Sequence, residues 1–214
     1  MPTVSDEHAD ERQRLADSLA RRDRVSDERV REALTTVPRH EFVPPAQRER
    51  AYDDRPLPIG DGQTISAPHM VAIMAEKLEL EPGDRVLEIG TGCGYHAAVT
   101  AELVGDEGAV YSVEYSDELA DEAESRLADL GYDVAVRVGD GREGWPEHAP
   151  YDAAYLTCAA PAFPDAVVDQ VRPGGRLLAP LGTAFQTLVF ARKREDGSLE
   201  TRKHGGVQFV RMRG

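Results

Sequence analysis

The sequence predicts an α/β fold in which a doubly wound, mostly parallel sheet ends in an antiparallel hairpin. Short apolar runs recur at residues 85–89, 109–114, 134–138, 153–157 and 176–180. Segments of helical period, such as residues 97–104 and 118–130, lie between them. Strands that are buried on both faces form continuous apolar runs, and their alternation with helices is typical of parallel crossover units. Two further runs, at residues 186–193 and 207–212, flank a polar turn and predict the closing hairpin.

The chain before the first of these strands divides into helices and a long irregular loop. Within residues 1–50, Ser26 is expected to cap a helix that ends before Pro38. Prolines and glycines are too frequent for regular structure between residues 42 and 68, and a loop of this length inside a compact protein is usually functional. Residues 68–80 then have the apolar spacing of a helix.

Length and composition favour a single domain. The chain has 214 residues, 41% of them hydrophobic, which suits one compact core. We therefore predict one domain over residues 1–214, made of an N-terminal helical segment (1–50), an active-site loop (51–70), a cofactor-binding α/β core (71–182) and C-terminal strands (183–214). No run of about 18 apolar residues is present and the N-terminus is polar and acidic, so we expect a cytoplasmic protein with no membrane partner.

The net charge of -14 argues against nucleic acid as a partner, because a phosphate-binding groove needs a clustered basic surface. Only Lys77, Lys193 and Lys203 of the 25 basic residues are lysines, which leaves 22 arginines against 39 acids. This composition favours a salt-rich cytoplasm and a halophilic archaeal source, with ordinary acidic solubility as the alternative. No feature indicates an oligomer, and we favour a monomer.

The two cysteines, Cys93 and Cys158, lack the spacing of a zinc site or of a disulfide scaffold. We therefore expect a reduced compartment and no metal. Both cysteines should lie at strand ends near the cofactor crevice, as small neutral side chains rather than nucleophiles.

A glycine-rich turn follows the first predicted strand. Gly90, Gly92 and Gly94 let the backbone approach a ligand closely. Thr91 lies within the same turn and is a further cofactor-binding candidate. The third glycine comes earlier than in a loop that seats a pyrophosphate. Glu88, just before the turn, would repel a pyrophosphate but suits the ammonium group of a methionine moiety.

Two more strand ends bring acids to the same edge of the sheet. Glu114 ends the second run, where its carboxylate can accept hydrogen bonds from both ribose hydroxyls. Asp140 and Gly141 follow the third run, where Asp140 could accept from an adenine amino group or could instead be a cap or a solvated turn residue. A ligand with an amine, a ribose and an adenine but no phosphate fits these positions. S-adenosyl-L-methionine is that ligand.

These residues are similar to the nucleotide-binding motifs of class I methyltransferases, and a longer match narrows the family. Residues 56–70, PLPIGDGQTISAPHM, closely resemble the signature of the protein-L-isoaspartate O-methyltransferases. The resemblance runs from about Ser26 to Gly182 and also takes in residues 37–44, 87–95, 139–141, 145–146 and 159–161. It implies a seven-stranded, Rossmann-like methyltransferase sheet.

The resemblance also implies an activity and residue roles. The family methylates the free carboxylate of L-isoaspartyl residues in damaged proteins and peptides, with D-aspartyl residues as a further candidate, and the ester then cyclises so that repair begins. Ser66 matches the family's proposed active-site serine, although it could also cap the helix that Pro68 opens. Gln63, Thr64 and Ile65 match a loop that folds over the cofactor.

The implied chemistry suits a site without a base. A carboxylate with an ordinary pKa of about 4 is already ionised at neutral pH. It needs alignment and exclusion of water, and hydroxyls such as those of Ser66 and Thr64 can orient it without adding charge. His69 is therefore expected to have a structural role rather than to act as a base.

The sequence departs from the family at several positions. Cys93, Cys158 and Asp61 stand where other residues are usual, and residues 207–212 lack the Phe-Val-Pro-Leu-like ending. The extra carboxylate of Asp61 is unfavourable beside an anionic substrate. Two alternatives therefore stay open: a methyltransferase of the same fold that acts on RNA or on a small metabolite, and a non-catalytic paralogue that binds the cofactor.

Overall fold

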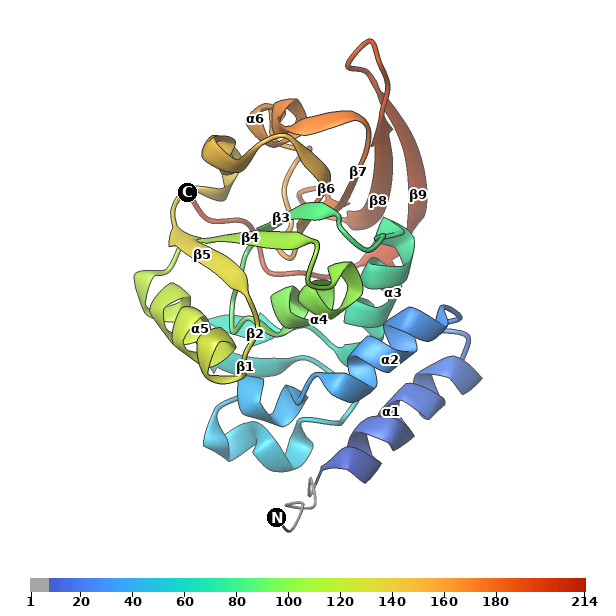
Figure 1. Ribbon diagram of the computed structural model, residues 1–214, viewed down its shortest axis with the longest axis vertical. Helices are drawn as coiled ribbons and strands as arrows, with labels where there is room; N and C mark the ends of the chain where they lie inside the picture. The colour runs from blue at the N-terminus through green and yellow to red at the C-terminus, as the bar shows by residue number, and fades with distance from the viewer. Residues whose placement is uncertain (1–7) are drawn as a thin grey trace.

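A seven-stranded sheet is the centre of the structure, a computed structural model that describes residues 8–214 (Figure 1). The strand order is β5-β4-β3-β6-β7-β8-β9, with β3 to β7 parallel and the last two strands antiparallel. The bounds are β3 (Arg85–Ile89), β4 (Ala109–Glu114), β5 (Val134–Val138), β6 (Tyr151–Leu156), β7 (Val171–Leu181), β8 (Gln186–Lys193) and β9 (Leu199–Val207). The predicted doubly wound fold with an antiparallel edge is confirmed.

Helices cover both faces of this sheet. Those of one face are α1 (Ala9–Arg21), α2 (Glu28–Thr36), α3 (Pro68–Leu78), α4 (Tyr95–Val104) and α5 (Asp117–Asp129), whose apolar residues share one buried cluster. The helix α6 (Asp165–Gln170) packs on the other face. Four 3-10 helices complete the helical part: η1 (Arg39–Phe42), η2 (Pro45–Arg50), η3 (Gly141–Glu143) and η4 (Pro146–His148).

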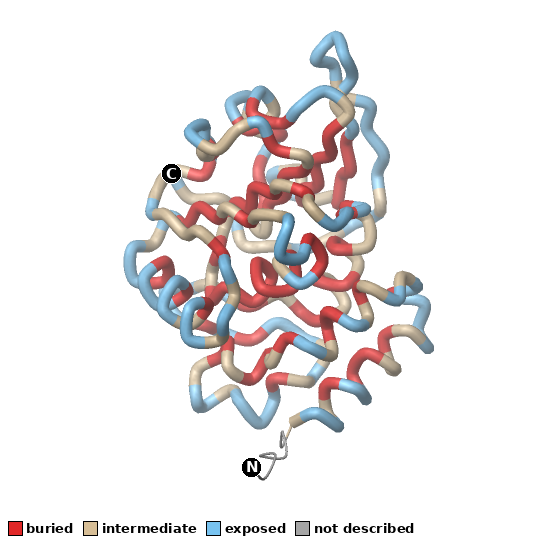
Figure 2. The backbone as a smooth tube through the Cα atoms, in the orientation of Figure 1, coloured by how far each residue is buried: buried red, intermediate tan, exposed pale blue. Residues whose placement is uncertain are grey.

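The core lies on both sides of the central strands (Figure 2). Successive residues of a strand point to opposite faces, so Val86 joins the cluster beneath α4 while Leu87 joins the cluster beneath α6. This two-sided burial explains why the strands of the sheet's centre are continuous apolar runs in the sequence.

A small hairpin interrupts the long loop before α3. Its strands are β1 (Leu57–Gly60) and β2 (Gln63–Ile65), and the register pairs Leu57 with Ile65. The turn between them, Gly60-Asp61-Gly62, has positive φ at all three residues. Prolines and glycines therefore shape a tight hairpin here rather than wholly irregular chain.

The predicted closing hairpin is correct in its first strand and wrong in its second. The strand that pairs with β8 is β9 (Leu199–Val207), a polar and mostly exposed edge strand, and not residues 207–212. Residues 208–214 leave the sheet and run across it toward β5 (Figure 1). Val210 and Met212 line a cavity while Phe209 packs on the core, and an apolar pattern alone does not separate such a tail from a strand.

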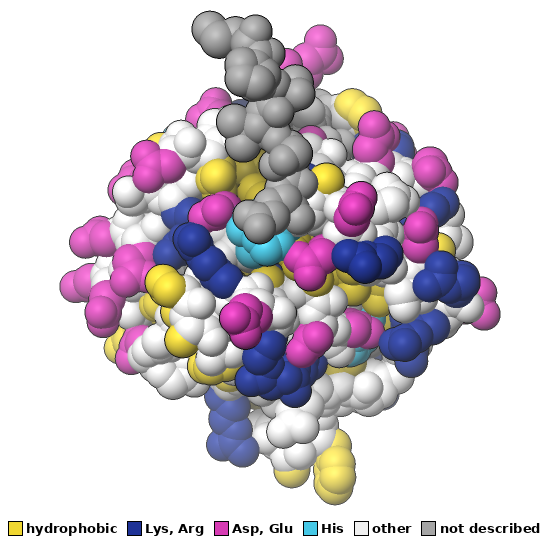
Figure 3. Space-filling model, turned by 90° about the horizontal axis from the view of Figure 1, so that it is seen from below, with side chains coloured by type: hydrophobic (Ala, Val, Ile, Leu, Met, Phe, Trp, Pro, Cys, Tyr) yellow, Lys and Arg dark blue, Asp and Glu magenta, His cyan; other side chains and the backbone are white. Residues whose placement is uncertain are grey.

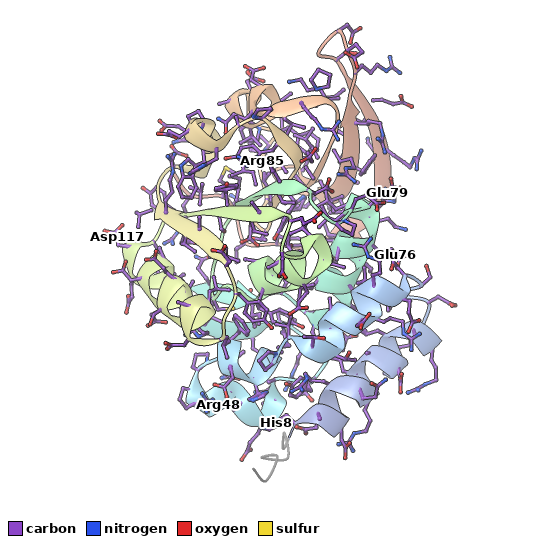
Figure 4. The ribbon with its side chains drawn as sticks, viewed as in Figure 1. His8, Arg48, Glu76, Glu79, Arg85 and Asp117 are labelled. Atoms are coloured by element: carbon purple, nitrogen blue, oxygen red, sulfur yellow. The ribbon has the colours of Figure 1, made fainter. Side chains whose placement is uncertain are left out.

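The N-cap of α2 is one residue later than expected. The carboxylate of Asp27 accepts from the backbone N–H groups of Arg29 and Val30. Ser26 instead donates its hydroxyl and its backbone N–H to Glu76 of α3, which lies beside α2 (Figure 4). The helix ends at Thr36, before Pro38 as predicted. Within residues 8–214 no helix is both long and apolar enough to span a membrane.

Replacing Asp27 with alanine should lower the free energy of unfolding by about 1 kcal/mol, because two backbone donors lose their acceptor. Urea denaturation measures the change. Asp133→Ala removes an exposed carboxylate before β5 and is the control, with an expected change within about 0.5 kcal/mol. Equal losses in the two variants would contradict the capping role.

Candidate active site

A cavity opens at the carboxyl ends of β3, β4 and β6, where several separate segments of the chain meet. The hairpin and the residue after it contribute Gln63, Thr64, Ile65 and Ser66, and the glycine turn contributes Gly90, Thr91, Gly92 and Cys93. Further walls come from Glu114, Tyr115, Gly141, Thr157 and Cys158, and from residues 210–213. The structure thus gathers most of the predicted site residues around one space, and Glu88, Gly94 and Asp140 lie outside its lining.

The glycine turn forms a cradle that side chains would fill. Gly90 has a φ of +98°, and a Cβ there would lie 2.4 Å from Thr157 Oγ1. Gly92 has a φ of +55°, and its Cβ would meet the side chain of Ile59 at 3.3 Å. Bare backbone therefore faces the cavity at these positions, as a ligand seated against the loop requires.

Glu114 presents a fixed carboxylate to the same space. It accepts hydrogen bonds from the backbone N–H groups of Gly92 at 2.9 Å, of Tyr115 at 2.9 Å and of Ser116 at 3.0 Å. Its side chain is only 8% exposed. A carboxylate has about four acceptor positions, so capacity is left for a ligand hydroxyl. The remaining acceptor position of Glu114 and the glycine turn together fit a nucleoside.

Glu88 lies beneath the cavity and is fully buried, contrary to the expectation that it faces the ligand. Ser112 Oγ donates to its Oε2 at 2.5 Å, and the hydroxyl of Tyr155 donates to its Oε1 at 2.8 Å. Burial raises the pKa of Glu88 to about 8, against the hydrogen bonds of the two hydroxyls, which lower it. Glu88 therefore lies below the glycine turn, held by Ser112 and Tyr155, and outside the lining of the cavity.

Gly94 and Asp140 also act outside the lining. Gly94 is the N-cap of α4 with a φ of +89°, and a Cβ there would approach Leu127 of α5 at 3.1 Å. The lack of a side chain at Gly94 thus allows α4 and α5 to pack closely. The carboxylate of Asp140 accepts from the backbone N–H of Arg142 at 2.9 Å and pairs with the Arg142 guanidinium. Asp140 therefore caps η3, and its contact with an adenine amino group stays a prediction.

Ser66 lines the cavity and does not cap α3. The N-cap of that helix is Ala67, which makes no side-chain capping bond. Asp54 takes the capping role instead, since its Oδ1 accepts from the backbone N–H of His69 at 2.9 Å. The same oxygen lies 2.8 Å from His69 Nδ1, so His69 is held against the loop and outside the cavity. The hydroxyl of Ser66 is left free of the structural role that competed with catalysis.

The carboxylate of Asp61 is neutralised within the structure. Arg213 Nη2 lies 2.8 Å from Asp61 Oδ2, although the two residues are 152 positions apart in the chain. The hydrogen bond from Arg213 lowers the pKa of Asp61 and keeps it ionised. The extra carboxylate of Asp61 is therefore compensated in charge by a residue of the C-terminal tail.

Several lining groups are poor bases at neutral pH. His96, at the start of α4, was not singled out from the sequence, yet it lines the cavity. Burial lowers its pKa to about 3, and its Nδ1 is buried with no hydrogen-bond partner within residues 8–214. Burial raises the pKa of the Cys158 thiol to about 12, and both cysteines are free thiols. Neither group is therefore suited to remove a proton from a nucleophile at neutral pH.

Sequence reasoning also missed the part played by residues 210–213 and by Tyr115 in the cavity wall. The apolar pattern of the tail predicts a strand, and no local signal indicates that the tail runs back over the site. Tyr115 could have been found, because it follows directly after the acid at the end of β4.

Comparison with known proteins identifies a family over nearly the whole chain. The model of the family described as protein-L-isoaspartate(D-aspartate) O-methyltransferase (PCMT) matches residues 10–214. The chain is 52% identical over 209 residues to protein-L-isoaspartate O-methyltransferase 2 of Archaeoglobus fulgidus, covering 97% of this chain and 95% of that protein. It is 52% identical over 206 residues to the protein-L-isoaspartate O-methyltransferase of Methanopyrus kandleri, covering 95% and 91%.

Solved structures with the same fold carry related names. One, titled protein-L-isoaspartate O-methyltransferase, superposes with a TM-score of 0.87 at 32% identity and covers 95% of this chain and 66% of that longer chain. A second, from Plasmodium falciparum, has a TM-score of 0.82 at 23% identity over 94% of this chain and 98% of that chain. Its title describes a putative protein-L-isoaspartate O-methyltransferase in complex with S-adenosyl-L-homocysteine.

Replacing Glu88 with glutamine should stabilise the protein at pH 8 relative to the wild type, and much less so at pH 5. The folded state holds a proton on Glu88 up to about pH 8, whereas the unfolded chain releases it near 4.5, so wild-type stability falls as pH rises between these values. Glutamine mimics the protonated form and removes this dependence. Thermal melting over the pH range measures it, and parallel curves for the two proteins would refute the assignment.

Proposed function

Because the chain belongs to the protein-L-isoaspartate O-methyltransferase family, we propose that the cavity holds S-adenosyl-L-methionine and that the hairpin end presents the substrate beside it. The protein is a carboxyl methyltransferase that methylates L-isoaspartyl residues of damaged proteins, using S-adenosyl-L-methionine, and so begins their repair. When bound, the cofactor supplies a methyl group on a positively charged sulfur, which makes that methyl electrophilic. The residues of the chain bind the cofactor, align the substrate carboxylate with its methyl group and exclude water.

The proposed cofactor contacts come from lining residues only. Glu114 accepts from the ribose hydroxyls, and the turn from Gly90 to Gly92, which includes Thr91, seats the methionine part against bare backbone. Gln63 and Ile65 cover the cofactor from the hairpin side, and Gly141 borders the adenine. Glu88, Gly94 and Asp140 support these contacts from behind.

Ser66 and Thr64 are proposed to orient the substrate carboxylate. Their hydroxyls line the cavity on the hairpin side and carry no charge that would repel an anion. The observation that carries this assignment is that residues 63–66 share one cavity with the glycine turn and Glu114, although they lie in different parts of the chain. The high pKa of Cys158 and the low pKa of His96 suit a reaction that needs no general base.

We further propose that the protein works in a salt-rich cytoplasm as one methyltransferase domain spanning residues 1–214. The support is compositional: 39 acidic residues against 25 basic residues give a net charge of -14. Acidic side chains are spread among basic ones over the face shown in Figure 3. Salt screens their mutual repulsion within about 3 Å at 1 M.

The purified protein should transfer a tritiated methyl group to a peptide that contains L-isoaspartate, and the product should be a base-labile ester. The matched peptide with ordinary aspartate is the control and should stay unlabelled, and a D-aspartyl peptide defines the stereochemical range. The assay is run at low and at high potassium chloride, so that loss of folding is not mistaken for loss of activity. Labelling of cellular RNA without ester formation would overturn the proposed substrate.

Two substitutions should separate substrate alignment from cofactor binding. Ser66→Ala should lower kcat by about tenfold or more, while the affinity for S-adenosyl-L-homocysteine, measured by calorimetry, changes by less than about threefold. Gly92→Val should abolish that binding, because a branched side chain at a φ of +55° would strain the turn and fill the cradle. Equal loss of binding in both variants would show that this division of roles is wrong.

A further inference from the structure

The C-terminal tail, residues 208–214, forms the outer wall of the cavity and is anchored at two places along the sheet. Beside β8, the amide side chain of Gln186 bonds the backbone of Phe209 twice, at 2.6 and 3.0 Å. After β6, the backbone N–H of Ala159 donates to Val210 O at 2.8 Å, and that of Met212 donates to Ala159 O at 2.9 Å. The tail is therefore a fixed strap up to Met212.

Beyond these anchors, a side-chain contact joins the tail to the hairpin. Arg213 lines the cavity, and its Nη2 lies 2.8 Å from Asp61 Oδ2 at the hairpin turn and 3.9 Å from Glu114 Oε1. Its guanidinium carbon also lies 5.4 Å from the ring centroid of Tyr115. One cation thus links the hairpin turn, the tail and the carboxylate that we assign to the ribose.

We propose that Arg213 is a wall residue of the cofactor site, that Asp61 positions it there, and that this ion pair must open before the cofactor product leaves. The inference rests on the proposed function, because it takes Glu114 as the ribose-binding carboxylate. It adds a specific pair of side chains that controls the residence of the cofactor.

The hairpin turn is built to present Asp61 to the tail. Asp61 has a φ of +46° between two glycines with positive φ, a conformation that aspartate tolerates better than most residues. The hydrogen bond with Asp61 raises the pKa of Arg213, so both groups stay charged throughout the working range of pH. Both side chains are about one third exposed, at 34% and 36%, so the pair can open without disturbing the core.

The alternative is that the pair merely tethers the end of the chain. A tether would hold the tail in place but would leave cofactor release unchanged, since the tail is already fixed at Ala159 and Gln186. A wall residue would affect both the hold on the tail and the rate of cofactor release. The dissociation rate of S-adenosyl-L-homocysteine separates the two, and it is measured without turnover.

The test compares the full chain with Asp61→Asn, Arg213→Gln, Arg213→Lys and the double variant D61N/R213Q. Asparagine keeps the shape of Asp61 and tolerates a positive φ. Glu200→Gln is the matched control, because Glu200 pairs with Arg194 at 3.2 Å in the exposed β8–β9 hairpin, away from the lining of the cavity. Release of S-adenosyl-L-homocysteine is followed by surface plasmon resonance on immobilised protein.

Asp61→Asn and Arg213→Gln should each speed release about two- to fivefold, the range expected of a solvent-accessible ion pair. Arg213→Lys should retain most of the slow release, and E200Q should match the wild type. The double variant should release no faster than R213Q, because both substitutions remove one shared interaction. Unchanged rates in both single variants, or factors that multiply in the double variant, would overturn the proposal.

Hydrogen exchange of the ligand-free protein gives a second readout. The amides of Arg213 and Gly214, beyond the anchors at Ala159 and Gln186, should exchange faster in D61N than in E200Q, and equal exchange would show that the pair does not hold the end of this wall. A wild-type protein that bound no S-adenosyl-L-homocysteine would instead overturn the proposed function, and the exchange experiment would still report on the ion pair.

Discussion

The cavity depends on a row of buried hydrogen bonds beneath it. Glu88 of β3 stands in register with Ser112 of β4 and with Tyr155 of β6, and both hydroxyls donate to its carboxyl group. The row continues from Ser112 to Thr91 in the glycine turn at 2.6 Å, and from Tyr155 to Thr100 in α4 at 2.9 Å. Three strands, the turn and the helix after it are thereby fixed to one another, which sets the position of every ligand contact at this edge. Buried polar networks of this kind constrain a structure strongly when each member is satisfied.

Electrical neutrality is the second property of the site. The carboxyl group below it is largely protonated near neutral pH, and burial lowers the pKa of the lining histidine to about 3. Asp61, a carboxylate at its edge, is paired with Arg213. An anionic nucleophile approaching a sulfonium group needs such a surrounding, because uncompensated negative charge would repel it and a strong base would serve no purpose.

The sequence was most informative where local chemistry decides the structure. The strands from Arg85–Ile89 to Val134–Val138 are short apolar runs bounded by turn residues, so their limits could be read directly. The sequence was misleading where contacts between distant segments decide the structure. The edge strand β9 is polar because it is exposed, whereas the apolar tail, whose pattern predicts a strand, lines the cavity. Likewise, Ser26 is drawn from its expected cap to Glu76, a partner 50 residues away that no local pattern reveals.

The division of the cavity wall among distant segments couples the ligand to the lifetime of the protein. A bound molecule would touch the hairpin, the glycine turn and the tail at once, and the Asp61–Arg213 contact alone joins positions 152 residues apart. A ligand that binds only the folded chain adds about 2.7 kcal/mol of stability at a hundred times its Kd. The folded chain would then lose stability whenever the ligand concentration falls, and the hairpin, the glycine turn and the tail would all be affected because they share the cavity wall.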